Sequence, residues 1–246
     1  MKKIKRKIVG GAAVSACAFI LLSAAARSGD AKCYGTVPAA LVGKATEKPV
    51  IIIDAGHGGF DGGCTSADGV PEKGINLNIL LKLRDILEIS GYEVKVTRDS
   101  DISIHDSGVE GIAAQKSSDM DNRLAIFNSE ENAVCISIHQ NQYTQPQYKG
   151  AQMFYSSAVK HSEELASSLQ KSFSSILQPE NNREIKNCGK ELYLCHYSEN
   201  PTVMVECGFM SNPEESALLN TDEYQEKIAL TIFAGLNDYI FNSSKI

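Results

Sequence analysis

The 246-residue chain has 24 Lys and Arg against 30 Asp and Glu, and its apolar content of 43% is that of an ordinary globular protein. This length suffices for one domain with a substantial hydrophobic core and is too short for two domains that each have such a core. Five of the basic residues lie within the first seven positions, so 19 basic residues face 30 acidic ones in the rest of the chain, a formal charge of −11. An acidic body argues against nucleic-acid binding, which requires clustered Lys and Arg.

A basic leader and an uncharged apolar run open the chain. MKKIKRK is followed by 19 residues without a charge, Ile8–Ala26, a pattern typical of an export signal. The run is near the lower limit for spanning a bilayer, and Ser23–Ala26 offers small residues for cleavage. Residues 1–26 are therefore predicted to be a signal peptide or a signal-anchor. We expect an extracytoplasmic protein, held at the membrane if this segment is not cleaved.

Residues 27–48 are small, polar and punctuated by Gly and Pro, and they are predicted to form a linker before a domain at 49–246. The domain begins with a β-loop-α-β pattern. A continuous β-branched run at 50–54 predicts a strand buried on both faces, helical spacing predicts a helix over 74–91, and alternation predicts a strand over 92–98. This unit is the building block of a mostly parallel sheet.

Strand and helix patterns continue after a polar and irregular stretch at 99–119. Further strands are predicted at 133–141, 150–156, 190–196 and 202–208, and helices at 119–129, 159–177, 211–219 and 223–241. The third of these helices has Asn212 in the cap position and Glu215 in position to complete a capping box. The order predicts a single-domain α/β fold, with a mostly parallel twisted sheet of about six strands and helices on both faces.

The cysteines contain no CxxC pair, which argues against a zinc ribbon or a thioredoxin-like site. Most are expected to be free thiols that are buried or half-buried. Outside the cytoplasm some could form disulfides, but the sequence does not say which. The seven are Cys17, Cys33, Cys64, Cys135, Cys188, Cys195 and Cys207.

Three of the predicted strands end in polar side chains. They stop at His57, His139 and Glu206, and the carboxyl ends of strands form the ligand crevice of open α/β sheets. Two imidazoles, a carboxylate and an open position suit a catalytic zinc, and a further acid is then needed as proton shuttle. Glu72 can swing back to the first histidine from the start of a helix, whereas Glu206 ends a rigid strand and can stand over the metal-bound water. In that orientation Cys207 faces the other side of the sheet.

Other interpretations of these residues remain open. A histidine at a strand end is more often a hydrogen-bonded turn residue than a ligand. Successive candidates are 15, 67 and 67 residues apart, so no compact metal motif supports the site. Asp54 is a candidate to fix the tautomer of a ligand histidine, and capping of the glycine turn is an equal alternative.

Six segments of the chain resemble one known family. They are IIIDAGHGGFDGG, EKGINLNI, TRDSD, NRLAIFN, SIHQN and VECGFMSNPEE, in that order over residues 50–240. Together they are similar to the zinc-dependent N-acetylmuramoyl-L-alanine amidases of bacterial cell walls, the amidase_3 group. The resemblance implies that one zinc ion per chain is held by His57, Glu72 and His139, and that Glu206 is the catalytic acid and base.

The resemblance also implies the reaction, which is hydrolysis of the amide between the lactyl group of N-acetylmuramic acid and L-alanine in peptidoglycan. Arg123 is a candidate either to bind an acidic group of the stem peptide or to hold a structural acid, and the structural role is favoured. Asn141, beside the second histidine, is a candidate substrate contact. No family role is assigned to His105, His161 or His196, of which the last is expected to end a strand near the site.

Two departures from the general family pattern suggest a subtype. In some relatives a long helix after the second histidine strand plugs the active site, but here only ten residues, Gln140–Lys149, precede the next predicted strand and leave no room for it. The second departure is that no wall-binding repeat is appended. The chain thus resembles sporulation-type amidases that prepare muramic δ-lactam in the spore cortex, with targeting by the anchor or by an activating or targeting protein partner. Two alternatives stay open, a catalytically silent wall-binding or activator protein of the same fold and a zinc peptidase that cuts stem peptides.

Overall fold

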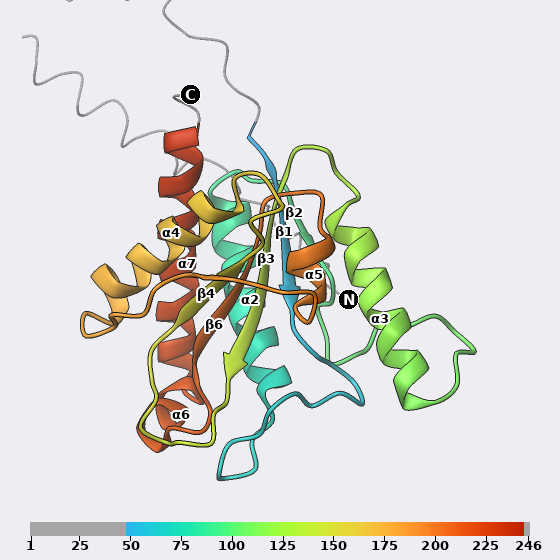
Figure 1. Ribbon diagram of the computed structural model, residues 1–246, viewed down its shortest axis with the longest axis horizontal. Coiled ribbons are helices and arrows are strands. Elements are labelled where there is room, and N and C mark those ends of the chain that lie inside the picture. Colours follow the sequence, from blue (N-terminus) through green and yellow to red (C-terminus); the bar gives the residue numbers. More distant parts are fainter. Residues whose placement is uncertain (1–47, 244–246) are drawn as a thin grey trace, which may run out of the picture. The chain divides into compact units, whose positions relative to one another are not determined.

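A computed structural model describes residues 48–243, in which six strands form one sheet (Figure 1). The strands are β1 (Val50–Ala55), β2 (Val94–Val96), β3 (Ala133–Asn141), β4 (Gln152–Tyr155), β5 (Lys186–Asn187) and β6 (Thr202–Phe209). Their order in the sheet is β2-β1-β3-β6-β4-β5. Neighbouring strands are parallel except β4 and β6, which are antiparallel. This architecture confirms the predicted, mostly parallel α/β fold.

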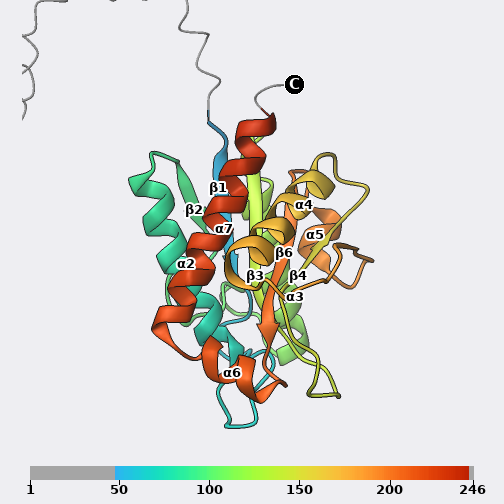
Figure 2. The ribbon, with the colours of Figure 1, turned by 90° about the vertical axis from the view of Figure 1, so that its left-hand side faces the viewer.

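Helices cover both faces of the sheet, as predicted. They are α2 (Glu72–Ile89), α3 (Ile112–Phe127), α4 (Ser162–Ser172) with its π-helical continuation η3 (Phe173–Leu177), α5 (Tyr193–Tyr197), α6 (Pro213–Leu219) and α7 (Asp222–Ser243). Helices α2, α4 and α7 lie over one face, which Figure 2 shows toward the viewer, and α3 and α5 lie over the other. Within residues 48–243 no helix combines the length and the apolar character needed to cross a bilayer.

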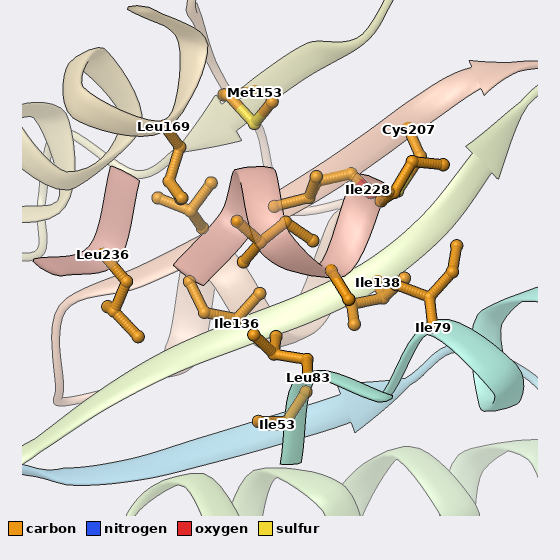
Figure 3. Close-up of a cluster of buried hydrophobic side chains, with 14 of the residues drawn as sticks. Ile53, Ile79, Leu83, Ile136, Ile138, Met153, Leu169, Cys207, Ile228 and Leu236 are labelled. Atoms are coloured by element: carbon orange, nitrogen blue, oxygen red, sulfur yellow. The ribbon is translucent and has the colours of Figure 1, made fainter. Parts of the chain in front are cut away.

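The uninterrupted apolar run of β1 reflects burial on both faces of the sheet. Ile51 and Ile53 belong to the larger core cluster with α2, α4 and α7, whereas Ile52 packs with Phe127 of α3. Figure 3 shows the larger cluster, in which β3, β4 and β6 meet the helices through Ile79, Leu83, Ile136, Ile138, Met153, Leu169, Cys207, Ile228 and Leu236. Full burial of one such aliphatic side chain stabilises a fold by about 1.5–3 kcal/mol. The two clusters therefore fix the helices to the sheet and align the carboxyl ends of β1, β3 and β6.

The predicted strand at 190–196 is wrong, because this segment contains helix α5 instead. The last strand of the sheet is the short β5, which pairs with β4. Beyond it the chain crosses to the face of α3, where the neighbouring residues Leu194 and Cys195 are both buried. A strand points adjacent side chains to opposite sides, whereas a single helical turn can bury both on one side.

Helix α3 starts earlier than predicted, and helix α6 has the predicted cap without the predicted capping box. Helix α3 begins at Ile112, seven residues before the predicted Asp119, and its first turns are largely exposed, so they carry no apolar periodicity. The Asn212 side chain caps α6 by accepting the backbone N–H of Glu215 at 2.9 Å, as predicted. The Glu215 carboxylate does not complete a capping box with Asn212. It accepts the backbone N–H groups of Gly150 and Phe209 instead.

The five cysteines among residues 48–243 are free thiols, and four of them are buried, as expected. Cys17 and Cys33 lie outside the described residues. The predicted signal or anchor segment at 1–26 and the predicted linker also fall outside them, apart from residue 48, and both stay predictions.

Candidate metal centre

Three side chains from different elements meet at the carboxyl ends of β1 and β3. His57 follows β1, Glu72 is the first residue of α2, and His139 lies near the end of β3. One ligand atom from each lies within 4.8 Å of the other two. Glu72 Oε1 is 3.0 Å from His57 Nε2 and 3.3 Å from His139 Nδ1. The structure therefore brings together the three residues that the sequence singled out as ligands.

The glycine loop after β1 sets the direction of the His57 ring. His57 itself has a left-handed backbone with φ of 64°, a conformation that is uncommon outside glycine and clusters at functional sites. Its Nδ1 lies 2.9 Å from Asp61 Oδ2, and Asp61 also accepts from Lys116 Nζ at 3.0 Å. The carboxylate of Asp61 holds a proton on Nδ1 and turns Nε2 toward Glu72 Oε1, where a metal ion could replace the proton that Nε2 shares with that oxygen. Sequence reasoning missed Asp61, although its position four residues after His57 in the same loop was a usable clue.

Glu72 is buried and accepts two hydrogen bonds besides its contacts with the imidazoles. The backbone N–H of Cys64 donates to Oε2 at 2.9 Å, and Asn76 Nδ2 donates to Oε1 at 3.2 Å. Asn76 is oriented in turn by Gln140 Nε2 at 3.1 Å. Burial alone raises the pKa of Glu72, but hydrogen bonds and charge from His139 and His57 outweigh it, so this pKa is lowered. The carboxylate is thus ionised and aimed at both imidazoles, as a metal ligand must be.

Two glycines leave the space that these side chains fill. A Cβ atom on Gly56 would lie 2.1 Å from the ring of His139, and one on Gly63 would lie 2.4 Å from Cγ of Glu72. Gly63 also has a positive φ of 69°. The glycine-rich sequence after β1 is therefore required by close packing around the three candidate ligands.

We expect Gly56→Ala to displace His139 while leaving the fold intact. The backbone of Gly56 is not left-handed, so alanine fits its φ, but the new methyl group occupies the position of the imidazole. Loss of orientation of one ligand lowers metal affinity by about 10–100-fold, which titration with zinc and a chelating indicator measures. Gly62→Ala is the matched control, because its Cβ would lie 3.6 Å from its nearest neighbour, Pro71. Equal zinc affinity in the two variants would contradict this account of Gly56.

Glu206 lies next to the three ligand candidates on β6. It is the register partner of His139 on the adjacent parallel strand, so both side chains leave the same face of the sheet. Its Oε2 is buried and has no hydrogen-bond partner among the described residues. Burial raises its pKa to about 7, with Glu72 adding to the rise and His139 and His57 opposing it. The neighbouring Cys207 faces the opposite side and packs in the core, as predicted (Figure 3).

Arg123 and Asp54 form a buried framework behind the glycine loop. Arg123 is 1% exposed and donates to Asp119 Oδ2 at 2.6 Å, to Asp54 Oδ1, and to the carbonyl oxygens of Ala55 and His57 at 2.8 and 2.7 Å. This arrangement supports its structural role, and a substrate contact by Arg123 does not fit its burial. Burial raises the pKa of Asp54, but Arg123 and His139 outweigh it and hold this pKa below its usual value.

Neither role considered for Asp54 agrees with its contacts. Its carboxylate accepts from Thr97 and Ser137, both at 2.7 Å, as well as from Arg123. No ligand histidine and no backbone group of the glycine turn is among these partners. Asp54 therefore positions the site through Arg123, which holds the carbonyl oxygen of His57.

The remaining histidines lie apart from the three candidate ligands. His105 is hydrogen-bonded to Ser103, and His161 lies near Glu164 on the surface. His196 belongs to helix α5 and not to a strand end as expected. Its Nδ1 is buried without a hydrogen-bond partner among the described residues. None of the three is part of the cluster that could hold a metal.

Asn141 and Cys64 border the site without being part of the ligand cluster. Asn141 is half-buried at the end of β3, and its carbonyl oxygen accepts from Met210 N at 2.7 Å, so its proposed substrate contact stays a prediction. The Cys64 thiol lies 3.6 Å from the carbonyl oxygen of Gln140. Burial and the nearby Glu72 raise the pKa of this thiol, which disfavours the thiolate needed for metal binding.

Comparisons with known proteins agree on one family. The family model described as "Amidase_3: N-acetylmuramoyl-L-alanine amidase" matches residues 51–238. The germination-specific N-acetylmuramoyl-L-alanine amidase of Bacillus subtilis (strain 168) is 33% identical over 196 residues, which are 77% of this chain and 79% of that protein. AmiA of Escherichia coli (strain K12), an amidase of the same specificity, is 27% identical and is matched over 80% of this chain and 78% of its own length.

Solved structures of amidases resemble the fold closely. The CwlD amidase from Clostridioides difficile, solved in complex with the GerS lipoprotein, superimposes with a TM-score of 0.76 at 38% identity, covering 79% of this chain and all of that one. AmiC2 of Nostoc punctiforme gives a TM-score of 0.67 at 27% identity, over 80% of this chain and 99% of its own.

Proposed function

This chain belongs to the Amidase_3 family of N-acetylmuramoyl-L-alanine amidases, and from this premise we propose that it works with one zinc ion held by His57, Glu72 and His139 and with Glu206 as the catalytic acid and base. It is a hydrolase of peptidoglycan, as its family and relatives are. The convergence of two imidazoles and a buried carboxylate within 4.8 Å is the observation that carries the proposal.

The donor set suits a zinc site. Zinc binds imidazole nitrogen and carboxylate oxygen, and the three donor atoms of this cluster lie within 4.8 Å of one another. Glu72 Oε1 lies at 3.0 and 3.3 Å from the two imidazole nitrogens. Three protein ligands leave a fourth position open, and the unpartnered Oε2 of Glu206 is beside them on the same face of the sheet. The residues present therefore fit a catalytic zinc site and not a closed structural one.

Glu206 has the properties that a proton shuttle requires. A bound zinc ion would polarise the lactyl carbonyl group and lower the pKa of a water ligand from about 16 to about 7. The Glu206 carboxylate would take the proton of the attacking water and deliver it to the nitrogen of the departing L-alanine. Efficient proton transfer needs a group that titrates near the working pH, and burial raises the pKa of Glu206 to about 7. The rigid strand β6 keeps this carboxylate in place during both transfers.

We expect His139→Ala to lose zinc and to lose amide hydrolysis with it. Elemental analysis of the purified wild-type protein should give about one zinc per chain, and the variant should fall well below that. Intact peptidoglycan digested with the wild-type protein should release free stem peptides and leave the glycan strands uncut. Mass spectrometry of the soluble products and of the residual glycan measures this outcome.

The products also separate the proposed reaction from its alternatives. A cut inside the stem peptide would identify a peptidase, and the absence of any product would identify a silent binding protein or activator. Undiminished zinc in His139→Ala would remove this residue from the ligand set. His161→Ala is a matched control, because this exposed histidine is far from the ligand cluster in the structure and should change neither zinc content nor products.

We further propose a role in the spore cortex, where the product would be muramic acid freed of its peptide for muramic δ-lactam formation. The resemblance to a germination-specific amidase supports this role. The relative solved with a lipoprotein supports a protein partner of that kind for this chain. The enzyme acts on peptidoglycan outside the cytoplasm, with residues 1–26 proposed as its export signal or anchor. Cortex peptidoglycan that lacks peptide-free muramic acid after digestion would contradict this role.

A further inference from the structure

Arg183 is immobilised at the edge of the sheet beside the catalytic face. Its Nε donates to the carbonyl oxygen of Lys149 at 2.8 Å, and its Nη1 donates to Gln152 Oε1 at 3.2 Å. The guanidinium carbon lies 4.5 Å from the ring centre of Phe209 and 5.8 Å from that of Tyr148. These contacts hold a side chain that would otherwise lose considerable rotamer freedom on binding a ligand.

The sheet register places Gln152, a hydrogen-bond partner of Arg183, opposite the proposed proton shuttle. Gln152 on β4 is directly opposite Glu206 on the antiparallel strand β6, and Figure 1 shows these two strands side by side. Directly opposed residues lie on the same face with Cβ atoms about 4.5–5.5 Å apart. The buried Gln152 is fixed by donating Nε2 to the carbonyl oxygen of Glu184 at 2.8 Å. Gln152 therefore lies between Glu206, which it faces across the two strands, and Arg183, to which it is hydrogen-bonded.

The outer edge of the Arg183 guanidinium is available to a ligand. Among residues 48–243, Nη2 donates no hydrogen bond, and no carboxylate lies within 4.0 Å of the guanidinium nitrogens. The side chain also lines a hollow of about 530 Å³ together with Tyr148 and Lys149. Neither Glu206 nor the three candidate ligands line this hollow, so Arg183 stands between it and the catalytic face. Glu215 also borders this hollow, but its carboxylate is occupied by the backbone N–H groups of Gly150 and Phe209.

We propose that Arg183 binds a free carboxylate of the stem peptide and so selects acidic stems for cleavage. This inference rests on the amidase reaction proposed above. A guanidinium with a fixed plane and an open edge recognises carboxylates through charge-assisted, often bidentate hydrogen bonds. The carboxylate on the second stem residue follows the cut amide by about two residue lengths, roughly 7 Å along an extended chain. One side chain, that of Gln152, separates Glu206 from Arg183 in the structure, and we assign this second residue of the stem to the guanidinium.

A purely structural role for Arg183 would use the same contacts, since they also tie the loop before β4 to that strand. The two roles differ in their dependence on the substrate. A structural arginine affects every substrate equally, whereas a carboxylate-binding arginine affects only substrates with a free carboxylate. The discriminating experiment therefore changes the substrate and the side chain together.

The test compares two muramoyl dipeptides that differ only in whether the carboxyl group of the second residue is free or amidated. The zinc-loaded wild-type enzyme should cleave the free acid with kcat/KM about 10–100-fold above that for the amide, the range expected of one charged hydrogen bond. Arg183→Gln should lose this preference through a higher KM for the acid, with little change for the amide. Arg183→Lys keeps the charge without the planar fork and should show an intermediate preference.

Lys186→Gln is the control for general electrostatics, because it removes an exposed cation from β5 at the same sheet edge. It should keep the full preference for the acid. Equal losses on both substrates in Arg183→Gln, or an unchanged preference in that variant, would overturn the assignment. Failure of the wild-type enzyme to cleave either dipeptide or peptidoglycan would instead count against the proposed reaction.

Discussion

Glu206→Gln is expected to lower kcat for amide hydrolysis by about 10²–10⁴-fold, the usual contribution of a general acid and base, while the zinc content stays unchanged. The side-chain amide of glutamine has the shape of the glutamate carboxyl group but cannot take a proton from the attacking water. The buried Oε2 of Glu206 has no hydrogen-bond partner among the described residues, so no structural contact is lost in the exchange. Steady-state hydrolysis of a soluble muramoyl peptide, with elemental analysis of the same sample, measures both quantities.

Glu214→Gln provides the matched control for this variant. Glu214 is exposed in the first turn of α6, and its amide should leave both kcat and zinc content at wild-type values. Loss of zinc from Glu206→Gln would make Glu206 a ligand and would require a different proton shuttle. Retention of wild-type kcat in Glu206→Gln would show that the substrate amide is hydrolysed without the Glu206 carboxylate.

The sheet was predictable from local patterns because its strands are buried on both faces. The apolar runs that became β1, β3 and β6 needed no information beyond their own residues. The predicted end of the third strand at Glu206 was wrong, because β6 continues to Phe209, but His57, His139 and Glu206 all lie in the carboxyl-terminal half of their strand or directly after it. Parallel order then brings these ends together, which is why the amino-acid sequence alone allowed His57, His139 and Glu206 to be grouped. Glu72 required the further step that a helix entrance can face the same crevice.

The supporting residues could not be predicted in this way, because their roles depend on loop conformation and burial. Asp61 reaches His57 only through the left-handed backbone at His57 and the turn that follows it. Asn76 is one helical turn after Glu72, yet its bond to Gln140 joins residues 64 positions apart. The polar start of α3 and the helical turn of α5 were missed for a related reason, since neither has the apolar spacing that indicates its secondary structure.

Arg123→Ala is expected to reduce the free energy of unfolding by about 3–5 kcal/mol, the usual cost of removing one partner from a buried ion pair. Asp54 would lose its only ion-pair partner among the described residues and would remain in the interior. The carbonyl oxygens of Ala55 and His57 would lose a donor at the same time. Equilibrium unfolding in urea, followed by circular dichroism, measures the change.

Arg84→Ala serves as the control, because Arg84 pairs with its exposed neighbour Asp85, and such surface pairs contribute about 0–1 kcal/mol. The two arginines thus make the same kind of bond in different surroundings, and only burial distinguishes them. Because Arg123 also fixes the backbone of His57, zinc affinity in Arg123→Ala should fall together with stability. A loss below about 1 kcal/mol in this variant would mean that water reaches Asp54 readily, and the buried framework would then not be what holds the first ligand in place.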